Sequence, residues 1–191
     1  MSTYLSFLTA ALPKWILRCH ISKGEATLYV HSEYVFPLLS FLKNHTNARF
    51  QVCVDILGVD FPSRKQRFEI VYNLLSIQYN SRLRIHTSID EITPINSVVS
   101  VFPSAGWFER EVWDMFGVYF SNHPDLRRIL TDYGFEGHPL RKDFPLSGFQ
   151  EVRYDDSEKR VVSEPIEMTQ EFRYFDFISP WTPGQKRNIH I

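Results

Sequence analysis

The sequence predicts an α+β fold, in which a small mixed or antiparallel sheet is flanked by helices and followed by a long irregular C-terminal arm. Apolar residues recur at helical spacing in Glu33–His45 and Ala105–Phe116. They alternate in Phe50–Gly58 and Leu83–Thr87, as in strands with one buried face. Beyond Gly148 neither period is present, and this change predicts the arm.

The first segment, Met1–Gly24, has two interpretations. It contains three basic residues and no acidic one, as in a transit peptide. It has only one arginine, however, and Trp15-Ile16-Leu17 after Pro13 has the pattern of an amphipathic helix. We favour the helix, followed by a short strand at Ala26–His31.

The pattern of residues 33–77 predicts a helix and two strands. Glu33–His45 is the helix, with Pro37 tolerated in its first turns. Phe50–Gly58 and Arg67–Ile77 are the strands, joined by the turn DFPSRKQ. Strict alternation in the first strand predicts one buried and one covered face; the alternating residues are Phe50, Val52, Val54 and Ile56.

A further strand and a short helical stretch complete the sheet region. Leu83–Thr87 alternates again, and Asn80-Ser81 before it is a plausible hairpin turn. Ile95–Phe102, after Pro94, is expected to be helical and to lead into the next helix.

The segment Ala105–Phe116 lies in the stretch with the densest pattern of charged and aromatic residues. Its apolar residues fall on one side, and Gly117 is well placed to end the helix. That side consists of Ala105, Phe108, Val112, Met115 and Phe116. Glu109, Arg110 and Asp114 lie off this stripe. Because Arg110 and Asp114 are four residues apart, we expect them to pair on the helix surface.

The chain therefore divides into three predicted regions: an α+β domain at 1–117, a turn-rich docking segment at 118–148 and an extended arm at 149–191. Gly and Pro recur every few residues in the second region, which excludes a long helix there. Glycine in that region allows backbone turns that other residues would strain. The glycines concerned are Gly134, Gly137 and Gly148.

The arm combines a charged stretch, Glu151–Glu171, with a cluster of large aromatic residues. The cluster consists of Phe172, Tyr174, Phe175, Phe177 and Trp181. A segment without periodicity cannot bury a continuous face of its own, yet these aromatics are costly to leave in water. Either the arm lies on a partner, with its aromatics as anchors, or it folds back on its own domain. The residues alone do not decide between the two.

Composition excludes several classes of function. The net charge of −1 provides no concentrated basic surface for nucleic acid. The longest uncharged run in the middle of the chain, Ile92–Phe108, is interrupted by Pro94 and Pro103 and predicts no membrane span. The two cysteines, Cys19 and Cys53, cannot supply the four thiolates of an ordinary iron–sulfur cluster. We expect both to be reduced and buried.

Three carboxylates near the helix, Glu109, Glu111 and Asp114, are candidates for acid–base catalysis. Catalysis of the paired-carboxylate kind requires one pKa to be raised by burial. Because Arg110 stands among the three, we expect lowered pKa values and a structural ion-pair network instead.

The histidines and basic doublets are interpreted structurally. His123 has no second ligand at a metal spacing, so we expect no metal site. We expect His123 and Asp125 to fix the loop before Arg127-Arg128 by hydrogen bonds. Arg127-Arg128 and Arg141-Lys142 lack a glycine-rich phosphate cradle and are expected to form interface salt bridges. No GxSxG motif is present, and neither cysteine has an activating cluster of positive charge.

One spaced pattern is specific. In it, Glu109-Arg110-Glu111 is followed after two residues by Asp114-Met115-Phe116. After six more residues comes His123, after a further three comes Arg127, and after one more come Ile129-Leu130. This pattern resembles the signature of the thirty-kilodalton subunit family of respiratory complex I. The run LTDYGFEGHPLRKDFPLSG, with EVRYDD, KRVVSEP and QEFRYFDF after it, is similar to the mitochondrial branch. The close resemblance covers roughly Val98 to Trp181, and Phe50–Ser81 fits more loosely.

The resemblance implies a core structural subunit of the peripheral, matrix-side arm of proton-translocating NADH:ubiquinone oxidoreductase, at the mitochondrial inner membrane. It implies contact with the forty-nine-kilodalton subunit and adjacent iron–sulfur subunits, and no homo-oligomer. Iron–sulfur clusters, FMN and ubiquinone would then belong to neighbouring subunits. The expected interface residues are Glu109, Arg110, Glu111, Asp114, His123, Arg127, Arg128, Arg141, Lys142, Phe172, Tyr174, Phe175, Phe177 and Trp181. The alternative is a free-standing soluble enzyme that uses the carboxylates of Glu109, Glu111 and Asp114.

Overall fold

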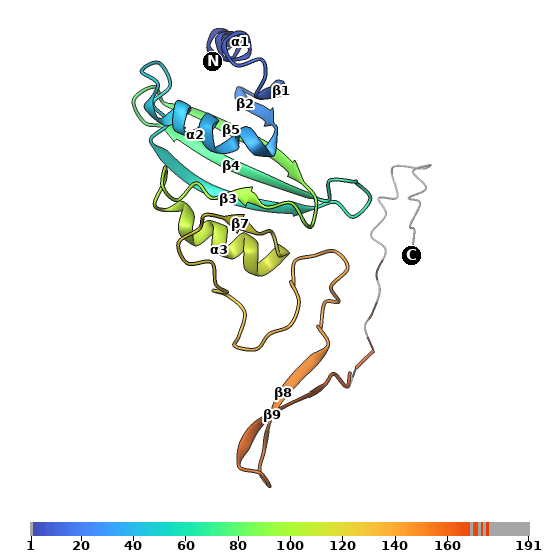
Figure 1. Ribbon diagram of the computed structural model, residues 1–191. Coiled ribbons are helices and arrows are strands. Elements are labelled where there is room, and N and C mark those ends of the chain that lie inside the picture. Colours follow the sequence, from blue (N-terminus) through green and yellow to red (C-terminus); the bar gives the residue numbers. More distant parts are fainter. Residues whose placement is uncertain (1, 169, 172, 174, 176–191) are drawn as a thin grey trace, which may run out of the picture. The chain divides into compact units, whose positions relative to one another are not determined.

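The computed structural model describes residues 2–168, 170–171, 173 and 175 (Figure 1). The chain forms two compact units, Met1–Leu146 and Ser147–Ile191, and each is described here by itself. Of the aromatic residues predicted in the arm, Phe175 is described. Phe172, Tyr174, Phe177 and Trp181 lie outside the described residues.

The first unit is built on a five-stranded mixed sheet with the strand order β1-β2-β5-β4-β3. The β2–β5 pair is parallel and the other three pairs are antiparallel, which confirms the predicted mixed sheet. Its strands are β1 (Ile16–Ser22), β2 (Glu25–Val30), β3 (Val52–Asp60), β4 (Phe68–Ser76) and β5 (Ser81–Ile89). A separate two-stranded parallel ladder joins β6 (Ile95–Asn96) to β7 (Phe120–Ser121).

Only one face of the large sheet carries the core. Along β4, every second residue from Phe68 to Leu74 is buried, and all four join one hydrophobic cluster. The apolar residues of helices α2 (Val35–Asn44) and α3 (Ala105–Phe116) belong to the same cluster, so both helices cover that face. The opposite face is mixed in character and partly exposed, with Leu57 and Val71 on it beside polar residues. It carries the Glu69–His86 pair and a hydrogen bond from Arg84 to Asn73.

The predicted alternation in the first central strand is broken by a β-bulge. The register of β3 against β4 shifts between Cys53 and Asp55. Phe50 and Ile56 are buried as expected, but Val54 is 42% exposed and Cys53 is buried in its place. A bulge adds one residue to one strand, so it reverses the side on which the following residues lie.

The central helix was predicted correctly, but the first helix was placed wrongly. Helix α2 follows a short 3-10 turn, η1 (Ser32–Tyr34), and contains Pro37 in its first turn. Helix α1 is Ser2–Ala11, whereas Trp15-Ile16-Leu17 leads into strand β1. Pro13 disfavours helical backbone at Leu12 and separates the two elements. The β-branched and apolar residues after it pair with β2 instead of continuing as a helix.

The expected helix at Ile95–Phe102 was also wrong. Ile95 donates its N–H to Tyr119 O at 3.0 Å, and Ser97 donates to Ser121 O at 2.9 Å. These bonds hold the segment as the short strand β6, and turns follow it up to Phe102. Long-range pairing therefore replaces the local helix.

The second unit contains a β-hairpin that the sequence pattern did not predict. Its strands are β8 (Gln150–Asp155) and β9 (Arg160–Pro165), paired antiparallel. Most residues on both faces of the hairpin are exposed or half-exposed. In the sequence, Val152 and Tyr154 alternate with Arg153 and Asp155 over a few residues only, and β9 has no strict alternation, so no strand was predicted here.

Candidate functional site

Helix α3 presents the signature residues. Its apolar stripe is buried in the core, and it ends at Gly117, whose φ of +78° is the left-handed conformation that glycine adopts without strain. This confirms the predicted helix and its end. A Cβ at Gly117 would lie 2.5 Å from His138 Nε2 and 2.6 Å from an Arg141 nitrogen. The 118–146 segment therefore packs closely over the C-terminal end of the helix.

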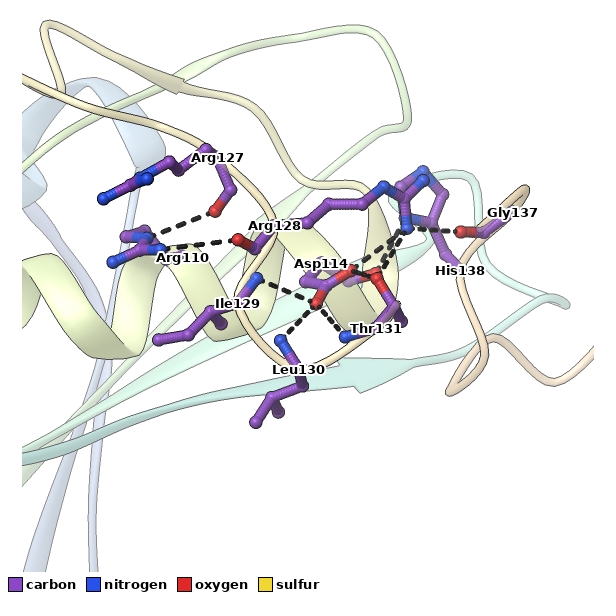
Figure 2. A network of polar contacts seen from close by, with 9 residues as sticks. All are labelled: Arg110, Asp114, Arg127, Arg128, Ile129, Leu130, Thr131, Gly137 and His138. Atoms are coloured by element: carbon purple, nitrogen blue, oxygen red, sulfur yellow. Dashed lines mark hydrogen bonds and ion pairs between the residues drawn. The ribbon is translucent and has the colours of Figure 1, made fainter. Parts of the chain in front are cut away.

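Asp114 is the centre of this packing (Figure 2). Its side chain is fully buried. Oδ2 accepts hydrogen bonds from the backbone N–H groups of Ile129, Leu130 and Thr131 at 3.2, 2.8 and 2.9 Å. Oδ1 accepts from Arg128 at 3.0 Å and from the Thr131 hydroxyl at 2.7 Å. One carboxylate thus holds the loop 128–131 against the helix.

The electrostatics of Asp114 match this geometry. Burial alone would raise its pKa, but the hydrogen bonds from the Thr131 side chain and from the backbone N–H groups of 129–131 outweigh that effect. They lower the pKa to about 2 from its ordinary value of 3.8. A lowered pKa was predicted for Asp114, but the prediction attributed it to Arg110, and this cause was wrong.

The expected surface pair between Arg110 and Asp114 does not form. Arg110 instead donates to the carbonyl oxygens of Arg127 and Arg128 at 3.2 and 3.4 Å, and its guanidinium lies 5.3 Å from the Trp107 ring centroid. Asp114 is covered by the loop 128–131 and is out of contact with solvent. Residues that lie off the apolar stripe of a helix are exposed to solvent only where no other segment of the chain covers them.

Glu109 is the second buried carboxylate of the signature. Its Oε2 accepts from the Ser97 hydroxyl at 2.6 Å, and Oε1 accepts from the Val98 N–H at 2.7 Å. Burial raises its pKa to about 7, because these two hydrogen bonds do not offset the lost hydration. The expectation of a lowered pKa was wrong for this residue. Structurally, Glu109 fixes the turn after β6 to helix α3.

His123 links the helix to the loop that follows β7, as predicted. Its Nδ1 accepts from the Asp125 N–H at 3.0 Å, so the ring proton is assigned to Nε2, which lies 3.3 Å from Gly106 O. Nε2 also lies 3.8 Å from Glu109. Within the described part of the chain, no group of three or more His, Cys, Asp or Glu side chains is arranged to hold a metal ion.

The basic doublets make bonds within the chain. Arg128 pairs with Asp114 and also donates to Gly137 O at 2.9 Å, while Arg127 pairs with Asp125 in an exposed position. Arg141 donates to Phe116 O at 2.6 Å. The Lys142 backbone N–H donates to Asp60 at 2.8 Å. The predicted intermolecular salt bridges of these residues stay predictions.

Sequence reasoning missed a third buried acid, Asp60, at the end of β3. Its carboxylate accepts two hydrogen bonds from Arg67, at 2.7 and 2.9 Å, and one from Lys142. Arg67 also pairs with Asp143 at 3.0 Å. The sequence did offer a signal for the Asp60–Arg67 pair, because Asp60 begins the DFPSRKQ turn and Arg67 follows it directly. It offered no signal for the contact with 142–143, because that segment is far away in sequence.

The three carboxylates do not form a catalytic site. Glu109 and Asp114 are each 0% exposed, so neither can reach a substrate. Glu111 is exposed, unlike the other two. Paired catalytic carboxylates must face one reacting bond at a defined separation, and this arrangement cannot do so. The enzyme alternative is therefore not favoured.

The cysteines also fail to form a cofactor site. Cys53 is buried as expected, but Cys19 is exposed, which corrects the prediction for that residue. They lie on β1 and β3, the two edges of the sheet, four strand spacings or roughly 19 Å apart. The residues of this chain do not fit an ordinary four-thiolate iron–sulfur cluster. Among the described residues, no helix is both long enough and apolar enough to cross a membrane.

One solved structure has a similar fold. It is the membrane-bound sulfane sulfur reductase, an archaeal respiratory membrane complex, of which one chain superposes with a TM-score of 0.66. The match covers 76% of this chain and 85% of that chain, at 23% identity. At this level of identity the likeness concerns the fold alone.

Curated relatives are much closer in sequence. "NADH dehydrogenase [ubiquinone] iron-sulfur protein 3" of Marchantia polymorpha is 76% identical over 178 residues, which cover 93% of this chain and 91% of the relative. The rice protein of the same name is 73% identical over 168 residues, covering 88% of each chain. "NADH-ubiquinone oxidoreductase subunit 9" of the alga Prototheca wickerhamii is 63% identical over 179 residues, covering 93% of each.

The matched region also contains the site. Residues 28–150 match the family described as "Respiratory-chain NADH dehydrogenase, 30 Kd subunit". This range includes β4, β5, α3 and the loop 128–131 that Asp114 holds. The chain therefore belongs to the thirty-kilodalton subunit family of respiratory-chain NADH dehydrogenase.

Proposed function

We propose that this chain is a structural subunit of proton-translocating NADH:ubiquinone oxidoreductase that supports assembly and electron transfer without carrying electrons itself. The observation that carries the proposal is the family match over residues 28–150, together with relatives named as subunits of that enzyme. The internal geometry supports the structural role, because the buried acids of the signature are used to hold segments of this chain together.

The proposal assigns the redox chemistry to neighbouring subunits. This chain has two cysteines, at opposite edges of its sheet, and no residues that fit an ordinary iron–sulfur cluster. FMN, iron–sulfur clusters and ubiquinone are then held by other chains. The contribution of this subunit is to keep those chains in a fixed geometry.

The proposed position is the peripheral arm, on the matrix side of the mitochondrial inner membrane. The forty-nine-kilodalton subunit and the adjacent iron–sulfur subunits are the proposed neighbours, as the family resemblance implies. We assign docking to the turn-rich segment 118–148 and to the arm 149–191. Each face of the β8–β9 hairpin carries side chains that are at least half-exposed, and a two-stranded hairpin is only marginally stable alone, which supports binding of the arm to a partner.

The test is deletion of residues 151–191, followed by measurement of the native particle that contains the chain. We expect the truncated chain to be absent from the NADH:ubiquinone reductase particle, while its sheet keeps its far-ultraviolet circular dichroism. An Asp156→Ala, Lys159→Ala double variant removes an exposed ion pair of the hairpin and serves as the control. Normal incorporation of the truncated chain would reject the docking role of the arm. Absence of the full-length chain from any such particle would reject the whole proposal.

A further inference from the structure

The charged residues of the α3 signature are almost all engaged inside the chain. Glu109 holds Ser97 and Val98, Asp114 holds the loop 128–131, and Arg110 donates to the carbonyl oxygens of that region. Glu111 is different. It is exposed, and within the described part of the chain it makes no hydrogen bond or ion pair. Its carboxylate is therefore available to a partner.

Two large, exposed apolar side chains stand near this part of the helix, one on α3 itself and one on the loop that Asp114 holds. Trp107 stands one helical turn before Glu111 on the same side of α3 and is 64% exposed. Leu130 is 60% exposed, and its backbone N–H is bonded to Asp114, which lies about one turn after Glu111. Figure 2 shows the Leu130 side chain directed away from the Asp114 network. We call Trp107, Glu111 and Leu130 the α3 surface.

The α3 surface is rigidly supported. Three backbone hydrogen bonds to one carboxylate fix the loop that carries Leu130. Arg110 contacts both the Trp107 ring and the carbonyl oxygens of 127 and 128. Preorganised aromatic anchors are the features that concentrate binding energy at protein interfaces, because little conformational entropy is lost on docking.

We infer that the α3 surface docks a different protein subunit that places a Lys or Arg side chain against Glu111 and apolar side chains around Trp107. Covering an unpaired carboxylate is unfavourable, and a Lys or Arg of the partner offsets that cost most strongly, because a charge-assisted hydrogen bond is stronger than a neutral one. Arg110 and Arg127 cannot supply this cation, because their guanidinium groups are already bonded within the chain. A second copy is disfavoured, since a two-fold interface would cover two Glu111 carboxylates and the α3 surface brings no cation of its own to either. Nucleic acid and anionic lipid are disfavoured for the same reason of charge.

This inference rests on the proposed function and names one of the surfaces through which the subunit would be held. The first experiment replaces Trp107 by the photo-crosslinking residue p-benzoylphenylalanine in the full chain, within the native particle. The same replacement at Ile77, which is 68% exposed in the β4–β5 turn, is the matched control. We expect crosslinking at 107 to another subunit, with at least about ten times the yield at 77, to a peptide that contains Lys or Arg.

The second experiment measures how fast the chain is lost from the purified particle in moderate salt. Trp107→Ala should increase this rate by about thirty-fold, the effect of removing a typical hot-spot residue. Glu111→Gln should increase it by about five-fold, and Glu111→Lys by more, because the charge is reversed. Glu33→Gln removes another exposed carboxylate and should leave the rate unchanged.

These outcomes separate the inference from the proposed function. If the chain is in the particle but residue 107 crosslinks only to its own chain, or no more than residue 77 does, the docking role of α3 is rejected and the proposed function stands. Crosslinking to a second copy of the chain, or a crosslinked peptide without a basic residue, also rejects it. If the chain is absent from the particle, the proposed function itself fails.

Discussion

Replacing Asp114 by Asn tests whether one buried carboxylate organises the end of helix α3. The substitution keeps the shape of the side chain but removes its charge and turns one acceptor oxygen into a donor. Oδ2 accepts from three backbone N–H groups and Oδ1 from Arg128 and Thr131. The amide nitrogen will take the Oδ1 position, because the Thr131 hydroxyl can rotate and become an acceptor there, whereas a backbone N–H cannot. The charge-assisted bond from Arg128 is then lost.

Two independent arguments give the magnitude. A hydrogen bond to a charged group contributes about 1.5–3 kcal/mol. The lowered pKa of Asp114, about 2 against 3.8, corresponds to roughly 2.5 kcal/mol of preference for the ionised form in the folded state. These describe the same interactions and are not added. We therefore expect Asp114→Asn to lower the free energy of unfolding by roughly 2–3 kcal/mol at pH 7.

The assay is urea unfolding of the purified full chain. Because the pKa of Asp114 is lowered by folding, its contribution is fully present above about pH 4 and is lost as the pH falls toward 2. The variant should lack this part of the acid dependence. Asp125→Asn, which breaks an exposed ion pair with Arg127, is the matched control and should cost less than about 1 kcal/mol. Equal losses in the two variants would refute the reasoning.

Two further substitutions test other parts of the site. The pKa of Glu109 is raised to about 7 by burial, so its contribution to stability is fully present below about pH 4.5 and is lost as the pH rises through 7. Glu109→Gln should therefore be more stable than the parent at pH 8, by up to roughly 3 kcal/mol, and nearly equal to it at pH 4.5 in urea unfolding; a pH-independent difference would contradict this. At Gly58, an added Cβ would lie 2.7 Å from the Phe116 ring. Gly58→Ala should cost about 1–3 kcal/mol in the same assay, and Phe116→Leu in that background should recover part of it, whereas unchanged stability would show that the contact can relax freely.

The sequence was a good guide to elements that bury one face. Helices α2 and α3 and strand β5 were predicted from their periodicity, and β2 and β4 were predicted as strand-forming runs; each has apolar residues in the core. The sequence was a poor guide where the segment that pairs or packs with an element lies far away along the chain. Ile95–Asn96 became a strand because it pairs with Phe120–Ser121, which is distant in the sequence.

The same division holds for the candidate site. The resemblance of the spaced pattern to a family signature grouped Glu109, Asp114 and His123, and the family it indicated is confirmed. The expected hydrogen bonding of His123 and Asp125 in the loop before Arg127 is confirmed. The sequence did not predict that the carboxylates of Glu109 and Asp114 are buried, or that their pKa values shift in opposite directions.

The sequence by itself determined helices α2 and α3, the central strands of the sheet and the family signature that α3 carries. Only the tertiary structure decided what the charged side of α3 does. Loop 128–131 covers Asp114 with five hydrogen-bond donors, whereas the turn after β6 gives Glu109 only two. The number of donors that distant segments bring to a buried carboxylate sets its charge state, and that number is not written in the helix itself.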